Sequence, residues 1–158
     1  MSDVVVFKGN DGKLEGFGDK GRRAYEKFRR TITALEIGAT LKFSFKLPRS
    51  PKHHRYFFWK LAGLFDRQDR FEDSERLRSW LTVGAGYADF VPGPDGQMVA
   101  LPQSLAYESM DEAEFVDLAQ KINTFLWTSY AREFLWPHLS SAQSYELLDV
   151  WNLEHDRK

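Results

Sequence analysis

The sequence contains no cysteine, only four histidines and no apolar run near the ~18 residues that a membrane span needs. Without cysteine the chain has no disulfides, no zinc site with thiolate ligands, no iron–sulfur cluster and no cysteine nucleophile. The first residues also lack the basic start and small-residue cleavage site of a signal peptide. We therefore expect a cytoplasmic protein that is stabilised by packing and has no membrane partner.

Aromatic residues, by contrast, are abundant. Thirteen Phe, six Tyr and five Trp make up 15% of the 158 residues, which exceeds what the core of one small domain holds. We therefore expect some of these rings at the surface. The overall composition, 42% hydrophobic and 28% charged, is that of a globular domain. It favours one α+β domain over residues 1–158, with an N-terminal hairpin, a short antiparallel sheet and four to five helices.

The elements follow from periodicity, because alternation of apolar and polar residues predicts strands and a period of 3.6 predicts helices. Ser50 is a good N-cap with Pro51 at the first helical position, and Ser109 with Glu112 has the pattern of a capping box. The predicted elements are a hairpin over 3–17, a helix over 19–35, a strand over 39–47, helices over 51–66 and 74–83, a hairpin over 87–101, a long helix from the capping box to 136, and a last helix from 140 or 141 to about 153.

Charge is strongly segregated along the chain. Residues 1–60, the basic half, hold 14 basic and 6 acidic side chains for a net charge of +8, whereas residues 61–158, the acidic half, hold 8 and 17 for a net charge of −9. Such a basic segment favours a polyanionic partner. The alternative is that the two halves pair with each other, either within the fold or across a homodimer.

The helix predicted over 19–35 has one apolar and one cationic side. A like-charged face forgoes the ion pairs that a merely solvated helix gains, so it favours a bound anion over the alternative of a solvated surface. Lys42, on the polar face of the strand predicted over 39–47, adds to it. The cations of the helix are Lys20, Arg22, Arg23, Lys27, Arg29 and Arg30, and only Glu26 interrupts them.

The helix predicted over 51–66 carries cations and aromatic rings together on its outer side, which His53 also faces. These residues are Lys52, Arg55, Tyr56, Trp59 and Lys60. Cations neutralise phosphates, and Trp and Tyr faces stack on unpaired bases. This combination predicts binding to single strands. The alternative for each ring is that it packs under the neighbouring hairpin or a second subunit. His54 projects onto the apolar side and is predicted to be a hydrogen-bonded core histidine.

Little in the sequence indicates catalysis. The four histidines form no metal-ligand pattern, and phosphate-binding loops, serine elbows and zinc-protease motifs are absent. We therefore expect no cofactor, no metal and no enzymatic activity. A Mg²⁺-dependent nuclease is the third possibility, because the run from Asp66 to Glu75 holds five acidic residues, although arginines are interspersed with them.

The segment Arg49-Ser-Pro-Lys-His-His-Arg-Tyr-Phe-Phe-Trp-Lys-Leu61 resembles a stretch of a phage protein family of unknown function. The segments Arg78–Tyr87, 94–96 and Ser109–Phe115 also resemble that family. More distantly, Arg49-Ser50, Arg55, Trp59 or Phe58, and Leu61 resemble a segment of the NinB/Orf phage recombination mediators. The first resemblance implies a phage origin and hence the cytoplasm of a bacterial host cell. The second implies a mixed α/β homodimer whose partners are single-stranded DNA and the host single-strand-binding protein.

We therefore predict a non-enzymatic, single-stranded nucleic-acid-binding accessory protein of phage replication or recombination, with DNA or RNA as its partner. The alternative is a protein-interaction or anti-defence factor that binds a host protein through acidic residues 108–117 or a surface around Trp127 and Trp136. The candidate nucleic-acid-binding residues are Arg22, Arg23, Lys27, Arg29, Arg30, Lys42, Arg49, Lys52, Arg55, Tyr56, Trp59 and Lys60.

Overall fold

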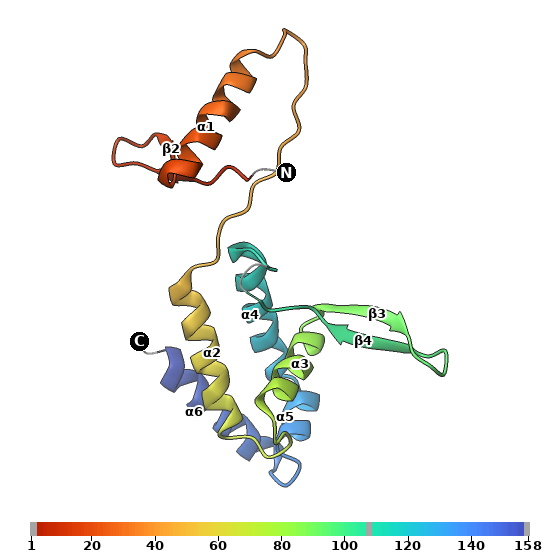
Figure 1. Ribbon diagram of the computed structural model, residues 1–158. Coiled ribbons are helices and arrows are strands. Elements are labelled where there is room, and N and C mark those ends of the chain that lie inside the picture. Colours follow the sequence, from red (N-terminus) through yellow and green to blue (C-terminus); the bar gives the residue numbers. More distant parts are fainter. Residues whose placement is uncertain (1–2, 107–108, 157–158) are drawn as a thin grey trace. The chain divides into compact units, whose positions relative to one another are not determined.

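A computed structural model describes residues 3–106 and 109–156 (Figure 1). Six helices and two small antiparallel sheets among these residues confirm the α+β class. Contacts within the chain divide it into two compact units, residues 1–45 and 46–158. The single domain expected over 1–158, with its basic and acidic halves, stays a prediction. In the described part of the chain, no helix is long and apolar enough to cross a membrane.

The first unit is a hairpin followed by a helix, as predicted. Strands β1 (Val6–Lys8) and β2 (Leu14–Gly16) pair antiparallel with Phe7 opposite Glu15, and α1 runs over Gly18–Thr33. The hairpin lies close to the start of α1, because a Cβ atom on Gly16 would stand 2.5 Å from the main-chain nitrogen of Arg22. Among the described residues of this unit only Gly16 and Gly21 are buried. The unit therefore buries little apolar surface of its own.

The strand predicted over 39–47 is wrong. Residues 39–50 form neither helix nor strand, and the apolar side chains at positions 41, 43, 45 and 47 are exposed. The alternating pattern is present, but no described strand lies beside it to accept its hydrogen bonds. A strand needs such a neighbour, so the local pattern alone does not produce one.

The second unit begins with α2 (Pro51–Phe65), and Ser50 is its N-cap as predicted. The chain continues through α3 (Ser74–Gly84) and a hairpin of β3 (Ala88–Pro92) and β4 (Met98–Pro102), in which Phe90 lies opposite Ala100. Helices α4 (Glu112–Leu126), α5 (Ser129–Leu135) and α6 (Ser141–Asp156) complete it.

Two details of the predicted long helix are wrong. Its N-cap is Asp111, whose side chain accepts the Glu114 N–H at 2.9 Å while the Glu114 carboxylate accepts the Asp111 N–H at 3.0 Å; Ser109 takes no part in this box. The helix also stops at Leu126, and the Thr128 side chain caps a new helix by accepting the Ala131 N–H. The division explains why six helices are found where five were placed.

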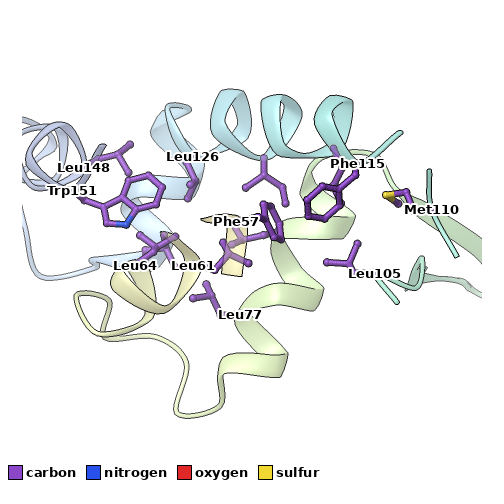
Figure 2. Close-up of a cluster of buried hydrophobic side chains, with 14 of the residues drawn as sticks. Phe57, Leu61, Leu64, Leu77, Leu105, Met110, Phe115, Leu126, Leu148 and Trp151 are labelled. Atoms are coloured by element: carbon purple, nitrogen blue, oxygen red, sulfur yellow. The ribbon is translucent and has the colours of Figure 1, made fainter. Parts of the chain in front are cut away.

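The core of the second unit lies between α2, α3, α4 and α6 (Figure 2). Figure 2 shows the side chains of α2 pointing toward those of α3, α4 and α6. Burial of these side chains at roughly 25 cal/mol per Å² is the main force that fixes α2 and hence its outer face. The labelled members are Phe57, Leu61, Leu64, Leu77, Leu105, Met110, Phe115, Leu126, Leu148 and Trp151.

Candidate nucleic-acid interface

The cations of α1 lie exposed along its outer side. Arg22 forms an ion pair with Asp19 at 3.7 Å, but both side chains are solvated, and such pairs are worth little. Arg23, Lys27, Arg29 and Arg30 form no ion pair with any described residue. Tyr25 and Phe28, whose ring centroids are 6.5 Å apart, are half-buried on the other side of the helix. The helix thus presents an unneutralised cationic face, which we call the α1 face (Arg22, Arg23, Lys27, Arg29, Arg30).

Lys42 is exposed in the segment that forms no strand, so the cationic strand face predicted for it does not exist in this structure. It belongs to the first unit with the α1 face. The candidates from Arg49 to Lys60 belong to the second unit. The structure therefore divides the twelve candidate residues into two sets of six.

On α2, Lys52 and Arg55 are exposed as predicted. Tyr56 and Trp59 are 38% and 43% exposed, with ring centroids 6.0 Å apart. The Tyr56 hydroxyl donates to the main-chain oxygen of His155 at 2.8 Å and to Asp156 at 3.2 Å. Burial, followed by the hydrogen bond to Asp156, raises the pKa of Tyr56.

The Trp59 ring packs against His155 of α6, with centroids 4.2 Å apart. This contact fixes the orientation of the indole but leaves almost half of the side chain accessible. Trp59 and Tyr56 therefore contact α6, whereas the alternative named the neighbouring hairpin, and both still reach the surface. Their stacking on bases stays a prediction. We call Lys52, Arg55, Tyr56 and Trp59 the α2 face.

Arg49 is a correction to the predicted site. Its side chain is only 1% exposed, and its guanidinium donates to the main-chain oxygens of Leu105 at 2.9 Å and of Ala106 and Met110 at 3.2 Å. It also lies 4.0 Å from the centroid of the Phe115 ring. Because these groups enclose the guanidinium, Arg49 holds the loop before α4 in place, and it is not the surface cation that the sequence predicted.

Lys60 is the second correction. Its ammonium donates to Asn152 at 2.9 Å and forms an ion pair with Asp156 at 3.1 Å. It also lies 4.9 Å from the centroid of the Trp151 ring. The charge is thus used to join α2 to α6. Asn152 and Asp156 follow Lys60 by more than ninety positions, and no local sequence signal pointed to this pairing.

The two histidines of α2 differ as predicted. His54 faces inward, where its Nδ1 lies 3.0 Å from Arg49, and burial followed by the Arg49 charge lowers its pKa. His53 is exposed and pairs with Glu112. The Ser50 N–H also donates to Glu112 at 2.6 Å, and this bond, followed by the one to His53, lowers the pKa of Glu112. A carboxylate of α4 therefore occupies the N-terminus of α2.

Three acidic residues of the run from Asp66 to Glu75 have structural partners. Asp73 caps α3, Glu75 pairs with Arg78, and Asp69 lies 3.3 Å from His138. No three His, Asp or Glu side chains among the described residues are grouped so that they could hold a metal ion. Within this run, Asp73 thus serves as a cap, and Asp69 and Glu75 take part in pairs.

The alternative protein-binding surface is corrected at Trp136 and otherwise stays a prediction. Trp136 is buried, and its indole N–H donates to the main-chain oxygen of Arg67 at 2.7 Å. Trp127 is half-buried against Tyr145. Between 108 and 117, Glu108 lies outside the described residues, and the other acidic side chains hold caps and ion pairs.

Comparison with known proteins gives one weak structural likeness and one family. The solved structure titled "Structural Genomics, NinB" shares 18% identity with this chain at a TM-score of 0.34, over 90% of this chain and 98% of the other. The sequence matches no curated protein significantly. The model of a family described as "Protein of unknown function (DUF1367)" matches residues 66–146, just over half of the chain. This match includes the segments Arg78–Tyr87 and Ser109–Phe115, which carried part of the resemblance, but not Arg49–Leu61. The chain therefore belongs to this family of proteins of unknown function.

Proposed function

We propose that the protein is a non-enzymatic accessory protein that binds single-stranded nucleic acid in phage replication or recombination. The observation that carries the proposal is the α1 face, where five exposed cations lie on one helix with only Arg22 in an ion pair among the described residues. Keeping like charges together costs free energy in the absence of a ligand, and a phosphate backbone relieves that repulsion.

The α2 face supplies the preference for single strands. Lys52 and Arg55 are exposed beside the partly exposed rings of Tyr56 and Trp59. Aromatic rings stack on bases of any identity but only when the bases are unpaired. The interface proposed here omits Arg49 and Lys60, because both are engaged within the fold.

The phage setting rests on the sequence resemblance of Arg49–Leu61 to a phage family. We extend the proposal to a homodimer in the cytoplasm of a bacterial host, which also engages the host single-strand-binding protein. The homodimer, the bacterial host and the host protein partner are proposed from the sequence resemblance. Nucleic-acid binding is proposed from the α1 and α2 faces.

A salt titration tests the proposal. If about five cations of the two faces meet phosphates, log K for a single-stranded oligomer should fall against log[salt] with a slope of roughly −3 to −4. Single-stranded DNA and RNA oligomers should bind more tightly than duplex of the same length. An affinity that does not depend on salt concentration, or the absence of binding at low salt, would contradict the proposal.

Trp59→Ala is expected to weaken single-strand binding by about 1–3 kcal/mol, because the substitution removes a stacking ring and no charge. Fluorescence anisotropy with a labelled oligomer measures the change. Phe90→Ala, at an exposed ring of β3, is the matched control and should bind like the unmodified protein. A loss of folding stability of about 3–5 kcal/mol with unchanged binding would instead identify Trp59 as a core residue.

A protein-interaction factor is the second candidate. The observation in its favour is the apolar surface of the first unit, where Val5, Phe7 and Phe17 are exposed and the ring centroids of Phe7 and Phe17 lie 6.2 Å apart. Such patches commonly mark protein interfaces. The salt titration separates the two candidates, because this one predicts no affinity for oligonucleotides at any salt concentration.

A further inference from the structure

Residues 40–47 have the alternating sequence of a strand, but no described strand pairs with them. Leu41, Phe43, Phe45 and Leu47 alternate with polar residues, yet Figure 1 draws this stretch without helix or arrow. Among the described residues, no main-chain hydrogen bond joins positions 40–46 to any other segment. Phe43 and Phe45 are 65% and 81% exposed. The segment therefore presents both an apolar face and unpaired peptide groups.

Both ends of the segment are set by the sequence. Gly38, with φ of +89°, turns the chain just before it, and Pro48, which has no N–H to donate, ends it. Between these limits an extended chain of alternating apolar residues is a template for pairing with another strand. The Phe43 ring packs edge-on against Phe28 of α1, with ring centroids 5.9 Å apart, but no described strand pairs with the main chain of residues 40–46.

We propose that residues 40–46 pair antiparallel with the same residues of a second copy of the chain, centred on Phe43. The inference rests on the homodimer of the proposed function and names the segment that forms it. In such a pair both apolar faces lie on one side of a two-stranded ribbon, where aromatic and aliphatic side chains contact one another.

Charge and proline select the centre of the pair. The two-fold axis that relates the two strands must pass through a residue position. An axis between two residues would shift the pairing by one residue and place apolar side chains opposite polar ones. Centring on Lys42 or Ser44 would place lysines directly opposite each other, which is destabilising. Centring on Phe45 would bring Pro48 opposite Lys42 and shorten the ladder.

The pair centred on Phe43 meets none of these obstacles. Phe43 lies opposite itself, Leu41 opposite Phe45 of the second copy, and Lys42 opposite Ser44 of the second copy. The other side of the ribbon then carries Lys42 and Lys46 from both copies. These four cations add to the charge that the α1 face offers to a phosphate backbone, which connects the pairing to the proposed function.

Single cysteines test the register, because the chain has none of its own. In the proposed pair the two Cα atoms at position 43 lie about 5 Å apart, within the range that a disulfide spans. Those at position 44 lie about 8 Å apart and those at 45 farther still, beyond that range. Full-length Phe43→Cys should therefore form a covalent dimer in oxidised glutathione at least about tenfold faster than Ser44→Cys or Phe45→Cys.

Non-reducing electrophoresis at equal chain concentration gives the rates, and circular dichroism checks that each variant is folded. The double variant Leu41→Cys/Phe45→Cys is an independent check, because it should cross-link while each single variant does not. Fastest cross-linking at position 44, equal rates at all three positions, or slow cross-linking at every position would overturn the proposal. Cross-linking needs no oligonucleotide, so failure of this proposal is distinguishable from failure of nucleic-acid binding.

Discussion

Arg49→Met is expected to lower the free energy of unfolding by about 3–5 kcal/mol, the largest effect of any single substitution considered for this chain. The change removes a buried guanidinium and leaves the main-chain oxygens of Leu105, Ala106 and Met110 without the donors they have now. Each lost hydrogen bond to a charged group costs roughly 1.5–3 kcal/mol, and the costs are not fully additive. Chemical denaturation measures the change.

Two further variants, Arg49→Lys and Lys52→Ala, serve as comparisons in this experiment. Lysine keeps the charge but cannot reproduce the planar fork that reaches three carbonyls, so an intermediate loss is expected. Lys52 is exposed, and its replacement should change stability by less than about 0.5 kcal/mol. If Arg49→Met were as stable as the unmodified protein but bound oligonucleotides weakly, the phosphate-binding role predicted from sequence would stand instead.

Reversal of Arg23, Lys27 and Arg30 to Glu is expected to weaken single-strand binding by about 100-fold or more at low salt. Each phosphate contact to a single strand contributes about −0.7 to the slope of log K against log[salt], so the slope should become shallower by about 2. The three side chains are exposed and form no ion pair with described residues. The fold should therefore survive.

The matched control reverses Lys8, Lys13 and Arg76, which are exposed elsewhere in the chain. It changes the net charge by the same amount, so it separates a local contact from a general electrostatic effect. The control should keep most of the affinity. If the α1 triple variant instead unfolds or dissociates with no binding defect, these cations pair the basic and acidic halves together, and the protein-interaction function replaces the one proposed.

Elements whose signals are local were predictable from sequence. Ser50 and Pro51 start α2 because the cap and the fixed proline φ act within one turn. The turn of the second hairpin follows from Gly96, whose φ of +80° few other residues adopt. The exposure of the α1 cations follows from the period of the apolar residues on the same helix.

Features that depend on distant partners were not predictable. Arg49 and Lys60 have the spacing of surface cations, and only acceptors 56 to 96 positions away make them structural. The break after Leu126 was also missed, because apolar spacing continues across it and the cap at Thr128 is a weak signal. The strand predicted over 39–47 is wrong for the opposite reason. Its local pattern of alternating residues is strong, but no described strand lies beside it.

The boundaries of the family match have a practical consequence for cloning. Residues 66–146 contain α3, α4 and α5 but exclude α2 and most of α6. A fragment cut at those boundaries would lose Phe57, Leu61 and Leu64 on one side and Leu148 and Trp151 on the other, all of them buried. Its remaining apolar surface would face water, and aggregation would follow. The shortest piece that keeps the interior of the second unit intact begins at Arg49, which is buried just before the α2 cap, and ends at the last residue of α6.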